Sequence, residues 1–485
     1  MAEIEIQTER VDDIPLLVKQ QQKMGIGEII DAVITPHWRR QGLSGGPGYV
    51  ILVYPLVSTL KKFGLDNASA WHLVNFLTFQ LGVYLFYRLI SRWLTDSAAL
   101  AASALFAYQP LLWGHAFINP KDIPFLVFFI GSMCFGFEMV DDIASNSKSK
   151  NIKLFIAALF MGIATANRVL GPLAAVLTGT YALTKLNSIK FGNLIKYFLA
   201  YGIGTLLFTL ILWPYLWTNP PLKFVEVFGF MSDNPTQLTV LFRGEQYKAG
   251  ELPLRYMPTF LDFSLTEPVW ALFTIGLVYS FFKSDNKKRL QLGLLLLWFL
   301  IPLAYVLLRR PSMYDGIRHF LFILPPIFIF GGFGFEWFFQ VIKQHSARII
   351  FGIVILSFGI IPAAQLHPYE YAYFNSFAGG VKGAFRTYET EYWLTCYREA
   401  VLELNQKASP GTQLYVRREP YIAAYYASEN VTIRDYRTEL NQIQSGDLVL
   451  ANSRSNEDLK YLHDEPAYLT VSRMGADFCV IKQVP

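Results

Sequence analysis

The sequence has little charge and little cysteine. Asp, Glu, Lys and Arg make up only 16% of its 485 residues, whereas about a quarter of the residues of a soluble globular protein are charged. Its three cysteines, Cys134, Cys396 and Cys479, are spaced neither for a metal site nor for an obvious disulfide framework. A nucleotide-binding glycine fingerprint, a Walker motif and a zinc spacing are also absent. These absences argue against a soluble nucleotide-dependent enzyme, and the net charge of +5 does not call for nucleic acid.

Long hydrophobic blocks take the place of charge. Hydrophobic residues make up 53% of the chain, and the mean hydropathy is +0.31. Blocks of about 20 residues can cross a hydrocarbon layer of about 30 Å, and they must be helical because lipid offers the backbone no hydrogen-bond partner. We expect about ten spans, near residues 71–90, 97–113, 122–140, 152–167, 169–184, 194–213, 266–282, 290–308, 319–336 and 348–364.

The positions of Lys and Arg predict the orientation of these spans. The basic loop 283–289 is the strongest cytoplasmic signal, because short cytoplasmic loops carry an excess of positive charge. Basic residues near 148–153, 185–196 and 343–348 agree with it. Alternating the spans between these loops places one polar set on the extracytoplasmic side: His115, Lys121, Asp122, Arg168, Arg309, Arg310, Tyr314, Asp315, Arg318 and His319.

The composition changes after about residue 365, where charged residues return and the long apolar blocks stop. Residues 391–404 have the pattern of an amphipathic helix, and 413–416, 447–450 and 478–481 that of short buried strands. About 120 residues are enough for an independent core. We therefore expect a soluble α/β domain that lies outside the cytoplasm.

The polar stretch 114–124 between two apolar blocks is the most informative local feature. Ionisable residues at the mouth of a helix bundle indicate a functional site. The alternative is an interfacial turn, in which Pro120 breaks the chain and Lys121 extends to lipid headgroups.

Four stretches carry a family resemblance: GHAFINPKDIPF at 114–125, WPYLW at 213–217, YDGIRHFLF at 314–322 and HPYEYAYFN at 367–375. From about residue 47 onward, the chain resembles membrane glycosyltransferases of the GT-C fold. It is most similar to glycosyltransferase family 39, the protein O-mannosyltransferase-like enzymes. The resemblance implies a polytopic all-α bundle and transfer of a sugar from a polyprenyl-phosphate donor to a protein or glycolipid acceptor. It also explains why no nucleotide-binding fold is needed.

Such a transfer needs a carboxylate to take the acceptor proton and cations to stabilise the leaving phosphate. The candidates for phosphate binding are Lys121, Arg168, Arg310 and Arg318, with His319 assisting; the alternative for each is a cation that extends to lipid headgroups. Asp122 is a weak catalytic candidate: it either caps the helix that follows or orients Lys121 or an acceptor. The other motif residues expected on this face are His115, Asn119, Tyr314 and Asp315. No metal ligands and no cofactor are identified, and the sequence leaves a requirement for a divalent metal open.

Residues 1–46 depart from the family pattern. They resemble the N-terminal region of an insertion-sequence transposase and contain no apolar span. The family's first helix and the acidic loop that follows it, which carries the catalytic base, are therefore expected to be missing through a gene fusion. The enzyme is then expected to be impaired.

The prediction is a multi-pass protein of the cell (inner) membrane in three parts. Residues 1–46 form a transposase-like segment, 47–364 a GT-C-like transmembrane domain, and 365–485 an extracytoplasmic α/β domain. Two alternatives to a glycosyltransferase stay open: a lipid-linked sugar transporter or flippase, and an inert gene remnant.

Overall fold

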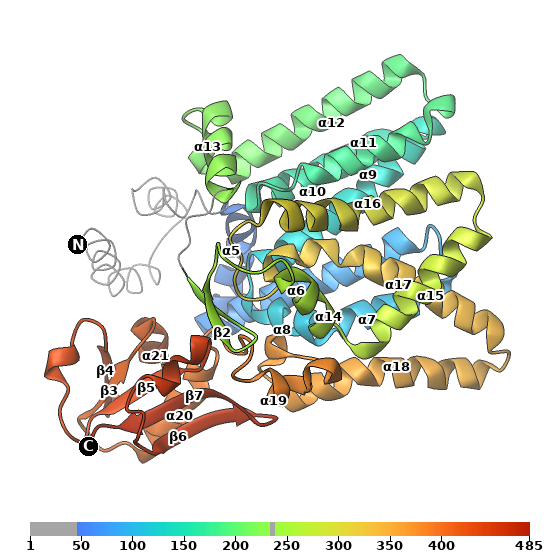
Figure 1. Cartoon of the computed structure of the whole chain (residues 1–485). Helices are drawn as coiled ribbons and strands as arrows, with labels where there is room; N and C mark the ends of the chain where they lie inside the picture. The colour runs from blue at the N-terminus through green and yellow to red at the C-terminus, as the bar shows by residue number, and fades with distance from the viewer. Residues whose placement is uncertain (1–45, 233–237) are drawn as a thin grey trace. The chain divides into compact units, whose positions relative to one another are not determined.

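The computed structural model describes residues 46–232 and 238–485, which form two compact units (Figure 1). The helical unit contains the described residues up to 232 and residues Ala249–Phe377. The α/β unit combines Leu238–Lys248 with Ala378–Pro485, so residues 365–377 group with the helices. The predicted transposase-like segment lies, but for residue 46, outside the described residues, and the three predicted domain limits stay predictions.

The helical unit is built from helices joined mainly by short turns. They are α5 (Gly48–Lys62), α6 (Asn67–Ile90), α7 (Asp96–Ala107), α8 (Pro110–Ile118), α9 (Asp122–Ala144), α10 (Lys150–Asn167), α11 (Leu173–Leu183), α12 (Phe191–Leu212), α13 (Pro220–Ser232), α14 (Tyr256–Phe263), α15 (Glu267–Lys283), α16 (Asn286–Arg309), α17 (Pro325–Val341) and α18 (His345–Leu366), with short 3-10 helices that include η3 (Arg318–Ile323) and η4 (Glu370–Ala372).

Five of the described helices are long and apolar enough to cross a membrane, namely α6, α9, α12, α16 and α18. The bent pair α14 and α15, with 101° between them, brings the number to six if it forms one span. Each expected span is helical, but ten spans are not confirmed. The expected span 97–113 is divided at Pro110 into α7 and α8, and the expected span 319–336 begins with 3-10 turns before α17 starts at Pro325, because proline removes a helical hydrogen bond.

The helices differ in how much of their apolar surface is covered. Helix α9 is buried along almost its whole length and packs against α6, α10 and α11. By contrast, α12 and α18 expose large apolar side chains such as Leu199, Ile211 and Ile353. Exposed apolar surface on long helices is stable against lipid rather than water. The chain is therefore a multi-pass membrane protein with α9 at the centre of its helical unit.

Helices α15 and α17 approach each other closely (Figure 1). A Cβ atom at Gly276 would lie 1.7 Å from the carbonyl oxygen of Phe330, and one at Gly334 would lie 2.4 Å from that of Leu272. Small residues permit such contact between membrane helices, where packing drives association. The two glycines therefore set the spacing of this helix pair.

The end of α9 away from Asp122 carries a cluster of ion pairs. Arg88 and Lys153 contact the carboxylate of Glu138, and Arg92 and Lys185 contact that of Asp141. Lys153, in the first turn of α10, and Lys185 belong to two basic stretches that the sequence assigns to the cytoplasm. These contacts place both lysines at one end of α9.

The α/β unit has a five-stranded sheet in the order β4-β3-β5-β7-β6. The strands are β3 (Thr412–Val416), β4 (Val431–Asp435), β5 (Leu448–Asn452), β6 (Ala467–Arg473) and β7 (Ala476–Gln483). Strand β3 is parallel to β4 and β5, whereas β7 is antiparallel to β5 and β6. Helices α20 (Cys396–Lys407) and α21 (Pro420–Tyr426) pack on the sheet. A hairpin of β1 (Thr239–Phe242) and β2 (Glu245–Lys248) belongs to the same unit.

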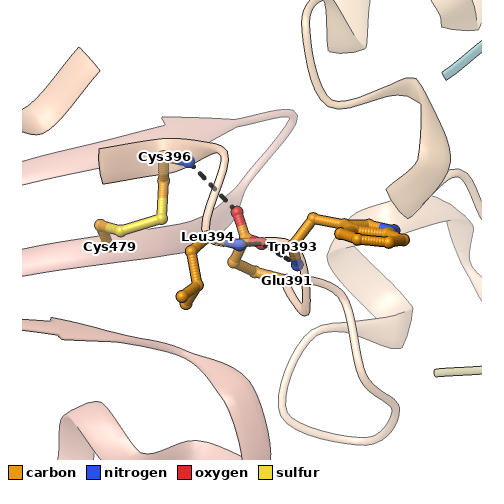
Figure 2. Close-up of a disulfide and its surroundings, with 5 residues drawn as sticks. All are labelled: Glu391, Trp393, Leu394, Cys396 and Cys479. Carbon is orange, nitrogen blue, oxygen red and sulfur yellow. Dashed lines mark hydrogen bonds between the residues drawn. A yellow bond between two sulfur atoms is a disulfide. The ribbon is translucent and has the colours of Figure 1, made fainter. Parts of the chain in front are cut away.

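A disulfide joins Cys396 at the start of α20 to Cys479 in β7, with 5.8 Å between the Cα atoms (Figure 2). The carboxylate of Glu391 accepts hydrogen bonds from the backbone N–H groups of Trp393, Leu394 and Cys396. This carboxylate therefore fixes the turn that leads into α20. Sequence spacing did not reveal the disulfide, because 83 residues separate its two cysteines.

The glycine contact between α15 and α17 is testable. Gly276→Ala should push the helices apart, since overpacking costs about 1–3 kcal/mol, and should lower the midpoint of thermal unfolding in detergent. Gly202→Ala in α12 is the matched control, because nothing lies within 4 Å of its added Cβ. Equal midpoints for the two variants would contradict the proposed role of Gly276.

Candidate functional site

The site is organised by the junction between α8 and α9. Asn119 follows α8, and its side-chain oxygen accepts hydrogen bonds from the backbone N–H groups of Lys121 at 3.1 Å and Asp122 at 2.8 Å. Pro120 has no N–H to satisfy. Asn119 thus provides the cap that lets α9 begin at Asp122.

The carboxylate of Asp122 joins three parts of the helical unit. It is 2% exposed, and it accepts a hydrogen bond of 2.8 Å from the side-chain nitrogen of Asn119. One oxygen is in direct contact with Nη2 of Arg168, at the end of α10. The other lies 3.4 Å from Nη1 of Arg318, at the start of η3. A buried carboxylate is costly unless it is paired, so these contacts hold the three segments together.

Arg318 is held by its own loop as well. Its Nη2 lies 3.0 Å from the buried carboxylate of Asp315, and its guanidinium carbon lies 5.1 Å from the centre of the Tyr314 ring. Asp315 and Gly316 both have positive φ angles, which make the tight turn. The hydroxyl of Tyr256 accepts a hydrogen bond of 3.0 Å from the N–H of Gly316. This loop fixes Arg318 in one orientation.

Two histidines border the same group of residues. His115 is fully buried, and its Nδ1 accepts a hydrogen bond of 3.2 Å from the side chain of Asn119. The ring of Tyr371 lies 6.2 Å from the ring of His115. His319 packs edge-on against Tyr314 at 4.7 Å. The structure therefore brings together all the candidate residues except Arg310, in what we call the Asp122 cluster: His115, Asn119, Lys121, Asp122, Arg168, Tyr314, Asp315, Arg318 and His319.

Arg310 lies elsewhere. It ends α16 in a left-handed conformation and lines a small pocket with Tyr256, Met257 and Val306. Among the described residues, no hydrogen bond or ion pair joins Arg310 to the Asp122 cluster. Arg310 thus has a different setting from Arg168 and Arg318.

Asp122 lies in the first turn of α9, where the helix dipole favours an acidic side chain, and its roles as a cap or as an orienting group for Lys121 or an acceptor stay predictions. Asn119 provides the side-chain cap, and the carboxylate of Asp122 is taken up by two guanidinium groups and one amide. Sequence reasoning also missed Asn167, whose side chain donates a hydrogen bond of 2.8 Å to the carbonyl oxygen of Lys121. The sequence signal that could have identified Asn167 was its place beside Arg168 in a polar turn. Tyr371, whose ring lies beside that of His115, belongs to the motif at 367–375, but the sequence does not single it out.

The cluster has a surplus of positive charge. Lys121, Arg168 and Arg318 carry three positive charges, and Asp122 and Asp315 carry two negative ones, which leaves +1 when Lys121 is protonated. The Nε–H of Arg168 is buried and has no hydrogen-bond partner among the described residues. Guanidinium groups bind phosphate and carboxylate oxygens well. The arrangement is thus suited to an anion.

A metal-centred site finds no support in the part of the chain that the structure describes. In that part, no three His, Cys, Asp or Glu side chains are grouped so that they could hold a metal ion.

No protein-family model matches the chain, and no curated protein matches its sequence. Among solved structures, the chain is similar to ArnT from Cupriavidus metallidurans, both in the apo state and bound to undecaprenyl phosphate. Each has a TM-score of 0.48 and 13% identity, over 90% of this chain and 88% of that chain. Arabinofuranosyltransferase AftD from mycobacteria has a TM-score of 0.43 and 12% identity, over 88% of this chain, which spans 34% of AftD. Because TM-scores below 0.5 do not establish a shared fold, the function must be argued from the site.

Lys121 makes anion binding at the cluster dependent on pH. Burial and the guanidinium of Arg168 lower the pKa of Lys121 to about 7, while the carboxylate of Asp122 opposes the shift. A phosphodiester anion beside Lys121 favours the ammonium form and so raises this pKa. Affinity should be highest below about pH 7 and should fall as the pH rises towards the higher pKa of the bound state.

Titration calorimetry in buffers of different ionisation enthalpy measures this linkage. Binding of a phosphodiester lipid at about pH 8 should take up protons. Lys121→Arg should bind with little dependence on pH, because a guanidinium stays protonated. A Lys121→Arg profile that matches the wild-type profile would rule Lys121 out as the titrating group.

Proposed function

We propose that this chain is a membrane glycosyltransferase of the GT-C type, which transfers a sugar from a polyprenyl-phosphate donor to an acceptor. The observation that carries the proposal is the Asp122 cluster, where Arg168 and Arg318 converge from distant segments on one carboxylate and leave a positive surplus. The family-39-like motifs at 114–125 and 314–322 supply every residue of this cluster except Arg168. A phosphate linked to a prenyl chain suits such a site in a membrane protein, because its tail can stay in lipid.

The residues of the cluster have different roles in the reaction. The acceptor oxygen attacks the anomeric carbon, the bond from that carbon to the phosphate oxygen breaks, and polyprenyl phosphate leaves with the electron pair. Arg168, Arg318 and Lys121 stabilise the charge that grows on the phosphate, which is most valuable where water is excluded. Asp122 orients the guanidinium groups. Because both of its oxygens are engaged by them, it is poorly placed to take the acceptor proton.

The disulfide supports an extracytoplasmic position for the α/β unit. Disulfides persist in oxidising compartments and are rare in the cytoplasm. Cys396 and Cys479 are both buried and bonded. Together with the predicted cytoplasmic position of the basic loops, the disulfide supports a protein of the cell (inner) membrane that acts on its outer face. The acceptor is then a protein or a glycolipid that reaches that face.

Sugar transfer by the purified chain in proteoliposomes tests the proposal. With a polyprenyl-phosphate sugar as donor, Arg318→Gln should lower kcat by about 10²–10³-fold, the usual effect of losing one donor to a developing anion. Arg289→Gln, in the basic loop at the far end of α16, is the control and should keep full activity.

The same assay separates the alternatives. Movement of the lipid headgroup across the bilayer without any new glycosidic bond would favour a transporter. A wild-type chain with neither activity would favour the inert remnant that a gene fusion predicts, and either result would contradict the glycosyltransferase proposal for this chain.

A further inference from the structure

Residues 367–377 follow α18 and pack against α8 of the helical unit. We call this segment the strap. Its short helix η4 packs on α8 so tightly that a Cβ atom at Gly114 would lie 2.2 Å from the backbone nitrogen of Tyr371. Further along, the side-chain nitrogen of Asn375 donates hydrogen bonds to the carbonyl oxygens of Asp262 at 2.7 Å and Leu265 at 2.9 Å. These contacts fix the strap at both ends, so the side chains it carries have defined positions.

The strap carries a histidine and a carboxylate in contact. Nδ1 of His367 lies 2.7 Å from Oε1 of Glu370. The Glu370 side chain is 4% exposed, whereas that of His367 is 70% exposed. A second such pair, His463 with Asp464 at 3.1 Å, is exposed on both sides, at 73% and 98%. Only the first pair therefore combines an accessible imidazole with a carboxylate that is held by the protein.

This arrangement suits proton transfer. A carboxylate on Nδ1 selects the tautomer in which Nε2 is the basic nitrogen, and it stabilises the imidazolium that forms when Nε2 takes a proton. Burial of Glu370 keeps the carboxylate in place. The other titratable groups that meet the strap are His115, whose ring lies 6.2 Å from that of Tyr371, and Glu267, which accepts hydrogen bonds from the N–H of Ser376 and the hydroxyl of Tyr373.

Helix α8 connects this pair to the Asp122 cluster. Gly114 touches the backbone of Glu370 and Tyr371, and Asn119, five residues further, donates its hydrogen bond to Asp122. The ring of Tyr371, the residue after Glu370, lies 6.2 Å from the ring of His115 in the cluster. The strap that carries the pair therefore borders the Asp122 cluster.

We propose that His367 is the general base of the transfer reaction and that Glu370 is its positioning residue; this inference rests on the proposed function. The acceptor hydroxyl gives its proton to Nε2 of His367 as its oxygen forms the bond to the anomeric carbon. The bond from that carbon to the phosphate oxygen breaks, and the electron pair leaves with polyprenyl phosphate. The imidazolium is held by the Glu370 carboxylate and later releases its proton to solvent.

The test is sugar transfer by His367→Ala in proteoliposomes. Loss of a general base should lower kcat by about 10²–10⁴-fold, with little change in the KM for the lipid donor. Added imidazole should restore part of the rate, because the site of His367 is open to solvent. His463→Ala is the matched control and should behave as wild type.

The Glu370→Gln variant distinguishes a positioning role of Glu370 from a purely structural role of the strap. Removing the carboxylate takes away the partner that orients the imidazole and stabilises its protonated form, so kcat should fall while the KM for the lipid donor stays unchanged. A strap that only holds the fold would lower the amount of folded protein without lowering kcat per folded enzyme. His367→Gln keeps a polar side chain of similar size, and it distinguishes lost chemistry from lost folding.

The outcomes distinguish a failure of the role proposed for His367 from a failure of the proposed glycosyltransferase function. Transfer by wild type together with undiminished transfer by His367→Ala, or an undiminished kcat in Glu370→Gln, overturns the role of the pair and leaves the glycosyltransferase standing. A wild-type chain that transfers no sugar overturns both.

Discussion

The carboxylate of Asp122 is the constraint on which the helical unit and its site depend. A buried carboxylate is tolerated only when it is paired, and removing one partner of such a pair is strongly destabilising. Here the partners come from the end of α10 and from the loop before η3. Because the buried carboxylate of Asp122 must be paired, it determines where the end of α10 and the loop before η3 lie. It also places their guanidinium groups next to Lys121.

Helix α9 separates two regions of different electrostatic character. Its first turn lies in the Asp122 cluster, and its last turns carry Glu138 and Asp141 with their cationic partners. Its 23 residues extend about 35 Å, which is comparable with the thickness of a bilayer core. A cationic cluster at one end of this helix and ion-paired basic residues at the other agree with the proposed glycosyltransferase, whose donor would come from lipid on the outer face.

Much of the fold could be predicted from sequence, because apolar blocks and basic loops report helices and their ends directly. Helix α9 and the strands β3, β5 and β7 lie where the patterns indicate. The number of spans was less predictable, since Pro110 and Pro325 divide apolar stretches that look continuous. The Cys396–Cys479 disulfide and the packing of Tyr371 on His115 depend on contacts between residues far apart in the chain. Likewise, only the folded chain shows that the side-chain oxygen of Asn119 accepts hydrogen bonds from the N–H groups of Lys121 and Asp122 at the start of α9.

The most direct test of this account is the affinity of the Asp122→Asn variant for polyprenyl phosphate, measured by native mass spectrometry and compared with its affinity for the uncharged polyprenol. Removing a negative charge beside an anion site would by itself strengthen phosphate binding. If Asp122 orients Arg168 and Arg318, as the geometry indicates, the variant should instead bind polyprenyl phosphate about tenfold more weakly, a loss of about 1.4 kcal/mol, with polyprenol binding unchanged. Equal or tighter binding of the phosphate would contradict the account.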